Sequence, residues 1–135
     1  MTVRFQVSTR ASGLRRTIDV YLYDTVEELR AAASNASPDH SFESTGGVCQ
    51  VPSYKWPRPD LAWFCVIRLH RKQIDFDTVA HEATHAAMEI YHADIMKWNA
   101  KARAHFRADN EPIAYLVGEI TERILFNLQR RNAWG

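Results

Sequence analysis

The sequence predicts an α+β fold, in one domain that spans residues 1–135, and three observations lead to this class. Two segments near the N-terminus alternate apolar and polar residues, as half-buried strands do. A later segment is rich in aromatic and β-branched residues and is short enough to be a strand. Three other segments carry the start and stop signals of helices. With 135 residues, of which 46% are hydrophobic, the chain can bury one core without disulfides or a structural metal.

The N-terminal part of the chain predicts a β-hairpin followed by a helix. Residues 3–10 and 15–24 are the expected strands, and the sequence ASG between them supplies the turn. Thr25 and Glu28 have the spacing of a capping box, in which each of the two side chains accepts a hydrogen bond from the backbone N–H of the other residue at the start of a helix. The alanine-rich segment that follows is expected to remain helical until Ser37-Pro38.

The middle of the chain predicts a loop and then a strand. Residues 37–60 hold four of the five prolines and a Gly-Gly pair, so we expect a loop with one short strand near residues 48–51. Residues 61–70, with the sequence LAWFCVIRLH, form the aromatic and β-branched segment. Their composition and length favour a strand over a helix.

Two helices are expected in the second half of the chain. Asp77 is a plausible N-cap for a helix over residues 78–98. A last helix is expected from about residue 110 to residue 130, with Pro112 in its first turn, where proline is tolerated.

Composition excludes several classes of partner. The 17 basic and 16 acidic residues give a net charge of +1, which creates no field suited to nucleic acid or to a membrane surface. Four arginines interrupt the first sixteen residues, so no signal peptide is expected, and no apolar run reaches the roughly 18 residues of a membrane span. We therefore expect a cytoplasmic protein, in which Cys49 and Cys65 are free buried thiols.

The feature that indicates a function is the pattern H-E-x-x-H, formed by His81, Glu82 and His85. Four residues advance an α-helix by about 400°, so the two histidines project from one face and both imidazoles can reach one zinc ion. Glu82 is rotated by about 100°, to the edge of the same site, where it can accept a proton from water without binding the metal. The pattern predicts a zinc site with a general base, in preference to histidines that share a helix by chance.

The motif, the strand before it and the helix after it resemble the zincin metallopeptidases over about residues 61–128. The resemblance implies a small zincin-like domain: an N-terminal hairpin and helix, a mixed sheet, an active-site helix that carries the motif, and a C-terminal helix with a third zinc ligand. In the metzincin branch a glycine and a third histidine follow the motif, but Met88 and Tyr91 occupy those positions here. The gluzincin branch, which takes a glutamate from a later helix, fits better.

The gluzincin resemblance implies that Glu111 is the third zinc ligand. The sequence NEPIA around it looks like the opening of the ligand helix in that branch. Glu119 and Glu122 of the same segment remain alternatives, and so does His105 in the preceding loop.

Tyr115 stands where thermolysin-like enzymes have an aspartate that orients a ligand histidine. Since partners of this kind fix the imidazole tautomer, another group such as Asp94 or Asp109 would have to supply the contact. Tyr115 is itself a candidate catalytic residue, because its hydroxyl could donate a hydrogen bond to a developing oxyanion.

The activity that the resemblance implies is zinc-dependent hydrolysis of a peptide bond in a peptide or protein substrate. Glu82 would accept a proton from water and pass it to the leaving amine. In zincins the strand before the active helix often provides the sheet edge on which the substrate lies, and residues 61–70 would be that strand here.

Two other interpretations compete with an active peptidase. One is a catalytically weak or inactive zinc-binding module with a regulatory or interaction role, of the kind expected from a phage or mobile element. Retention of Glu82 argues against it, since a structural zinc has no use for that carboxylate. The other is an interaction domain without metal that dimerises through its C-terminal helix, although the apolar positions of that helix are more simply the core of one chain.

Overall fold

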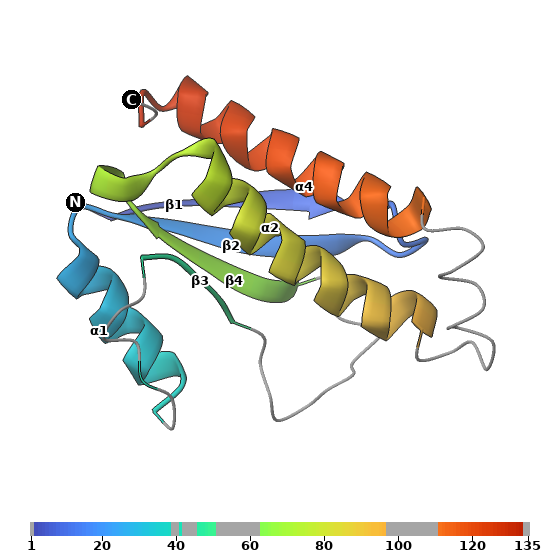
Figure 1. Cartoon of the computed structure of the whole chain (residues 1–135), viewed down its shortest axis with the longest axis horizontal. Coiled ribbons are helices and arrows are strands. Elements are labelled where there is room, and N and C mark those ends of the chain that lie inside the picture. Colours follow the sequence, from blue (N-terminus) through green and yellow to red (C-terminus); the bar gives the residue numbers. More distant parts are fainter. Residues whose placement is uncertain (1, 39–40, 42–45, 51–62, 97–110, 134–135) are drawn as a thin grey trace.

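Four strands and three helices make up the described part of the chain, which comprises residues 2–38, 41, 46–50, 63–96 and 111–133 of the computed structural model (Figure 1). The strands form one mixed sheet, so the α+β class predicted from the sequence is confirmed. The elements are β1 (Val3–Thr9), β2 (Arg16–Tyr23), α1 (Val26–Ala36), β3 (Val48–Gln50), β4 (Trp63–His70), α2 (Phe76–Tyr91) and α4 (Glu111–Arg130).

The sheet has the strand order β1-β2-β4-β3. β1 and β2 are antiparallel and form the predicted hairpin, β2 and β4 are parallel, and β3 is antiparallel to β4. Our expectation that residues 61–70 form the edge of the sheet is therefore wrong, because β4 pairs on both of its sides. Its nearly continuous apolar run is typical of an interior strand. Among the described strands, β3 lies at the edge beside β4, and β1 lies at the other edge.

α2 and α4 lie side by side across one face of the sheet (Figure 1). Because side chains alternate along a strand, every second residue of β1, β2 and β4 points toward these helices. The helices contribute their own apolar faces, and the two sets form one buried core. Its largest fully buried aliphatic side chains on this side of the sheet are Ile18, Leu22, Ile67, Leu69, Ile90, Leu116, Ile120, Ile124 and Leu128.

α1 packs against the opposite face of the sheet. Gln50 points to that face and donates hydrogen bonds from Nε2 to the carbonyl oxygen of Ala33 and to the hydroxyl of Ser37, at 2.9 and 3.0 Å. Arg68, on the neighbouring strand, donates to Oε1 of Gln50 at 2.7 Å and to the hydroxyl of Tyr23 at 2.6 Å. A polar network thus fixes α1 and the short strand β3 to the rest of the sheet.

The predicted start of the first helix is confirmed, and that of the motif helix is corrected. The hydroxyl of Thr25 accepts a hydrogen bond from the backbone N–H of Glu28 at 3.2 Å, as the capping box requires. α2 begins at Phe76, two residues before the predicted start, because Asp75 is its N-cap and accepts from the N–H of Thr78 at 2.7 Å. Asp77 lies in the first turn, where a negative charge favours the helix dipole.

The end of α1 and both ends of α4 lie close to the bounds that the sequence predicts. α2 ends at Tyr91 and continues as a π-helical turn over His92–Met96; the predicted end at residue 98 lies outside the described residues. α4 runs from Glu111 to Arg130, close to the predicted bounds, with Pro112 in its first turn. Within the described residues, no helix has the length and apolar character needed to cross a membrane.

Candidate functional site

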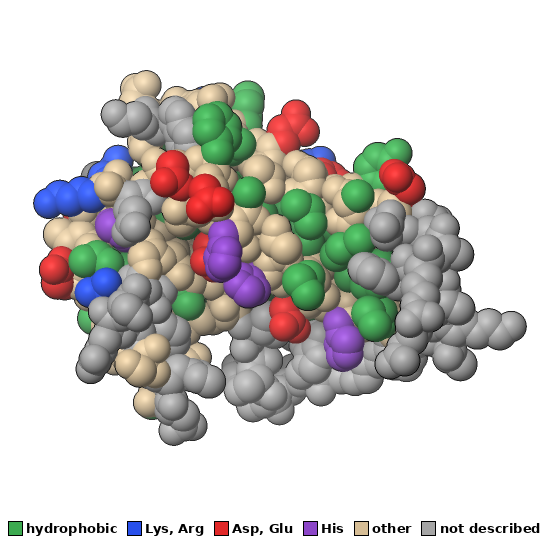
Figure 2. Space-filling view, in the orientation of Figure 1, with side chains coloured by type: hydrophobic (Ala, Val, Ile, Leu, Met, Phe, Trp, Pro, Cys, Tyr) green, Lys and Arg blue, Asp and Glu red, His purple; other side chains and the backbone are tan. Residues whose placement is uncertain are grey.

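α2 holds His81, Glu82 and His85 on one side of the molecule. One face of this helix is made of small and aliphatic residues, among them Val79, Ala83 and Ala87, which are buried against the sheet and α4. That burial fixes the rotation of the helix and leaves the two histidines exposed at its outer edge. Figure 2 shows histidine side chains lying together over this helix, with acidic side chains beside them.

The imidazole rings of His81 and His85 converge on one point. Their Nε2 atoms are 3.2 Å apart, and the ring centroids are 4.8 Å apart with the planes inclined at 79°. Two nitrogens bound to one tetrahedral zinc ion at 2.0–2.1 Å would be separated by about 3.3 Å. The two Nε2 atoms are therefore spaced as a pair of zinc ligands would be.

Glu82 is buried directly behind this pair. Its side chain is 6% exposed, and Oε1 lies 3.9 Å from Nε2 of His81. Oε2 is buried and has no hydrogen-bond partner among the described residues. A buried carboxylate oxygen without a partner is costly, so a polar ligand or water in the site would stabilise it. Burial raises the pKa of Glu82 above its usual value, and the positive charge that His81 can carry opposes this shift.

These three side chains line a cavity of about 320 Å³ between α2 and β3. The start of the edge strand contributes to the lining, and so does Glu89, which lies about two helical turns after His81 on α2. A volume of this size accommodates a metal ion, water and part of a ligand. Besides the motif residues, the lining consists of Gly47, Val48, Cys49 and Glu89.

Gly47 directly precedes β3 and lies against α2. A Cβ atom at this position would lie 3.2 Å from Cγ2 of Thr78 and 3.5 Å from Cγ of Glu82. A side chain at this position would crowd Thr78, so glycine favours the close approach of this segment to α2.

Replacing Gly47 by alanine should destabilise the fold, because the added methyl group would lie 3.2 Å from Cγ2 of Thr78 and push that side chain aside. We expect a loss of about 1–3 kcal/mol in the free energy of unfolding, measured with urea. Gly118→Ala is the matched control, since a Cβ there has nothing within 4 Å and α4 should gain about 0.5–1 kcal/mol. Equal stability changes for the two variants would contradict the close contact at Gly47.

The described residues do not complete the predicted ligand set around His81 and His85. No group of three or more His, Cys, Asp or Glu side chains that could hold a metal ion occurs within them. Glu111 is exposed at the first residue of α4, and its role as third ligand stays a prediction. His105 lies outside the described residues.

The two alternative ligands on α4 have other surroundings. Glu119 accepts a hydrogen bond from the hydroxyl of Thr9 at 3.0 Å and forms an ion pair with Arg123. Glu122 lines a separate groove, together with Ala80 and Arg123. Neither belongs to the lining of the histidine cavity.

The candidates for supporting roles are only partly described. Asp94 forms a buried ion pair with Arg16 and accepts a hydrogen bond from the hydroxyl of Ser12, so its carboxylate is engaged away from the motif histidines. Asp109 lies outside the described residues. The side chain of Tyr115 is 66% exposed on α4, and its catalytic role stays a prediction.

Sequence reasoning missed the residues that form the rest of the cavity. The Gly-Gly pair that includes Gly47 was interpreted only as a loop signal, and Cys49 only as a buried thiol. Glu89 could have been found, because it follows His85 by four residues and so lies on the same helix face. The contribution of β3 could not, because it depends on strand pairing.

Comparisons of the chain with protein-family models, with curated proteins and with solved structures found no match. The chemistry of the cavity residues is therefore what indicates a function.

Proposed function

We propose that the protein is a zinc-dependent peptidase of the zincin type, whose active site is the cavity between α2 and β3. The observation that carries this proposal is the convergence of the His81 and His85 Nε2 atoms to 3.2 Å beside the buried carboxylate of Glu82, which has an oxygen without a partner. A surface pair of histidines would not need a buried acid next to it. A purely structural zinc site would normally be closed by four protein ligands.

His81 and His85 would hold the metal through Nε2, and Glu111 is the third ligand that the gluzincin resemblance implies. When bound, zinc supplies Lewis acidity, which polarises a carbonyl group and makes water easier to deprotonate. The residues fit this metal, since imidazole and carboxylate are its common protein ligands.

Glu82 would carry the proton. Its carboxylate would accept a proton from water and later donate it to the leaving amine of the substrate. Because burial raises its pKa, the group is a stronger base than an exposed glutamate and holds the accepted proton more readily. Because the Glu82 side chain is almost fully buried, its carboxylate would exchange protons mainly with groups inside the cavity and not with bulk solvent.

The edge strand β3 would bind the substrate, in place of β4. Among the described strands β3 pairs only with β4, and its residues Val48 and Cys49 line the cavity. An extended peptide that adds to this edge would form backbone hydrogen bonds independent of its side chains. The scissile bond of that peptide would then lie in front of His81, Glu82 and His85. This placement favours a peptide or protein as the substrate.

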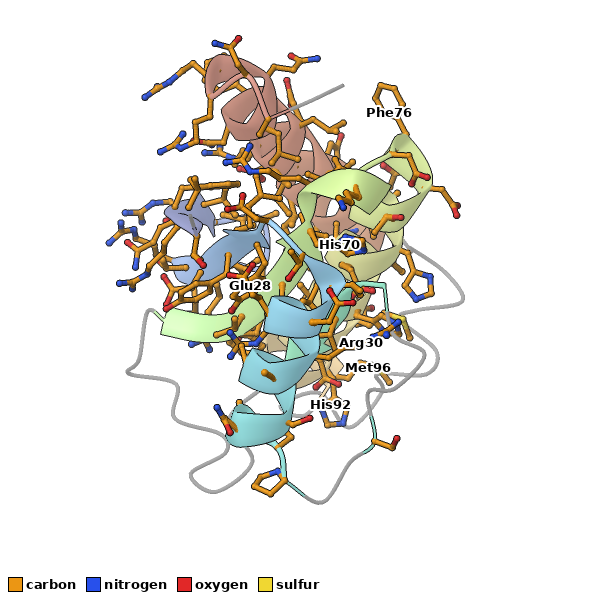
Figure 3. All side chains as sticks on the ribbon, turned by 90° about the vertical axis from the view of Figure 1, so that its left-hand side faces the viewer. Glu28, Arg30, His70, Phe76, His92 and Met96 are labelled. Carbon is orange, nitrogen blue, oxygen red and sulfur yellow. The ribbon has the colours of Figure 1, made fainter. Side chains whose placement is uncertain are left out.

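Metal analysis of untagged protein tests the site. We expect about one zinc ion per chain, and loss of zinc in His81→Ala and His85→Ala, because each substitution removes one of two converging ligands. His92→Ala is the matched control: His92 is exposed and lies near the opposite end of α2 from Phe76 (Figure 3). It should bind zinc as the wild type does.

Hydrolysis of a peptide library by the zinc-loaded protein tests the activity. Cleavage that disappears in His81→Ala and persists in His92→Ala supports a peptidase. Zinc binding without any cleavage would favour the zinc-binding module instead. Zinc content that is unaffected by both His81→Ala and His85→Ala would contradict the site itself.

A further inference from the structure

The two cysteines, 16 residues apart in sequence, meet beside the cavity. Both are free, as predicted from the sequence; Cys65 is fully buried and Cys49 is half-buried. Cys49 pairs with Ile67 across the β3–β4 ladder, and Cys65 lies two residues before Ile67 on β4, so both thiols point to the α2 face. Their Sγ atoms are 3.9 Å apart.

The two thiols differ in access. Cys49 is half-buried and lines the cavity that also contains His81, Glu82 and His85, so it is the thiol that a small reagent in the cavity would meet first. Cys65 lies behind it, with no exposed surface. An accessible thiol in contact with a second, sheltered one is the arrangement of an attacking and a resolving cysteine.

We propose that Cys49 and Cys65 are a redox modification site, at which a low-molecular-weight disulfide such as oxidised glutathione converts the two thiols into a protein disulfide and reshapes the cavity. Formation of the disulfide does not depend on the proposed function. Its consequence for catalysis does rest on that function.

The chemistry proceeds in two exchanges. The Cys49 thiolate attacks one sulfur of the small disulfide, whose S–S bond breaks and releases one thiolate, leaving a mixed disulfide on Cys49. The Cys65 thiolate then attacks the Cys49 sulfur and displaces the second small thiolate. Each cysteine loses one proton, and each released thiolate takes one up. The two cysteines are oxidised and the small disulfide is reduced to two thiols.

Cys49 is the thiol that reacts first. The hydrogen-bonding contact with Cys49, followed by burial, raises the pKa of the Cys65 thiol well above its usual range. Cys65 therefore carries little thiolate at neutral pH and cannot initiate the exchange. In the second step it needs only to attack a sulfur already held beside it.

Closing this bond should move β3. The two sulfurs must approach from 3.9 Å to a bond length of about 2.0 Å. Diagonal neighbours in an antiparallel pair have Cα atoms about 7–8 Å apart, slightly more than disulfides usually span. β3 has only three residues and pairs with one strand among those described, so it yields more easily than β4, which pairs with two.

A displacement of β3 reaches the motif through Gly47. This residue precedes β3 and lies against Thr78 and Glu82, where an added Cβ would come within 3.2 Å of Cγ2 of Thr78 and 3.5 Å of Cγ of Glu82. Movement of the strand must therefore change the space around the Glu82 carboxylate. The disulfide form should hold zinc more weakly, by about tenfold or more, as expected when groups that support metal ligands are disturbed.

Oxidised glutathione applied to the reduced, folded, metal-free protein tests the proposal by mass spectrometry. The wild type should lose the mass of two hydrogen atoms, yield a peptide in which Cys49 is linked to Cys65, and return to its original mass with dithiothreitol. Cys65→Ser should stop at a glutathione adduct on Cys49, and Cys49→Ser should remain unmodified. A wild type that stops at an adduct, or that remains unmodified, would overturn the proposal.

Zinc affinity of the reduced and disulfide forms then tests the effect on the cavity. A loss of about tenfold or more on oxidation, absent in Cys49→Ser, is the expected result. Equal affinities would overturn the claim that the disulfide reshapes the cavity. If neither form binds zinc while the linked peptide forms, the proposed function fails and the redox site stands.

Discussion

Glu82→Gln should abolish peptide hydrolysis while zinc remains bound. Glutamine has nearly the shape of glutamate but cannot accept a proton from water, and loss of a general base typically costs about 10²- to 10⁴-fold in rate. Zinc should remain because the two histidines are unchanged and Glu82 is not one of the predicted ligands. The measurement is the rate of peptide cleavage by zinc-loaded protein, with zinc content determined on the same samples.

A matched variant separates this effect from a general loss of charge. Glu27 is an exposed carboxylate on α1, which packs on the face of the sheet away from the cavity. Glu27→Gln removes one negative charge in the same way and should leave the rate unchanged. If Glu82→Gln cleaves peptides as fast as the wild type does, Glu82 is not the base and the proposed mechanism is wrong.

The same variant should alter the pH dependence of stability in metal-free protein. Burial raises the pKa of Glu82 above its usual 4.5, with His81 opposing the shift. A carboxyl group whose pKa is higher in the folded state binds protons more readily there, so the folded state loses stability as the pH rises from below 4.5 through the raised pKa. Glutamine does not titrate. Urea unfolding should show Glu82→Gln to be more stable than the wild type at about pH 7, by a margin that shrinks toward about pH 4.

Most of the secondary structure could be predicted because its signals are local. The alternation in β1 and β2, the capping pair Thr25 and Glu28, and the proline near the start of α4 each act within a few residues. The start of α2 was misplaced for the same reason. Asp75 and Asp77 are both good N-caps, and only the fold shows that the carboxylate of Asp75 accepts from the N–H of Thr78.

The position of β4 in the sheet shows the limit of local reasoning. Its apolar and β-branched composition predicts a buried strand, but composition does not indicate which strands pair with it. The parallel pairing of β2 with β4 joins residues more than forty positions apart, such as Val20 and Ile67. Contacts of that range depend on the whole topology, and they place β3, not β4, at the edge of the sheet.

In the candidate site, too, the local part could be predicted from the sequence and the long-range part could not. The convergence of His81 and His85 follows from helix geometry, so the sequence predicts it directly. The opposite wall of the cavity comes from β3, whose contact with α2 depends on the glycine at position 47. A third ligand would also come from a distant segment, and for that reason the identity of Glu111 as ligand depends on the gluzincin resemblance alone.

Removing one partner of the Arg16–Asp94 ion pair should cause the largest loss of stability. The two side chains are 3% and 1% exposed, and the pair joins the start of β2 to the π-helical turn that follows α2. The hydroxyl of Ser12 also donates to this carboxylate, and the guanidinium lies over the ring of Phe64 at 5.2 Å. Asp94→Asn should cost about 3–5 kcal/mol in the free energy of unfolding, because it removes the charge of the buried carboxylate to which Arg16 donates from both Nε and Nη2.

The exposed pair formed by Arg71 and Asp24 provides the control for this prediction. Its side chains are 36% and 38% exposed, and Arg71 Nε lies 2.8 Å from the carboxylate. Water replaces a lost partner there, so Asp24→Asn should cost less than about 1 kcal/mol. In the double variant Arg16→Met with Asp94→Leu, both charges of this pair are removed together, and much of the stability lost in Asp94→Asn should return. Equal losses for Asp94→Asn and Asp24→Asn in urea unfolding would mean that burial of the Arg16–Asp94 pair does not set the cost, and that the end of the motif helix is held to the sheet by apolar packing alone.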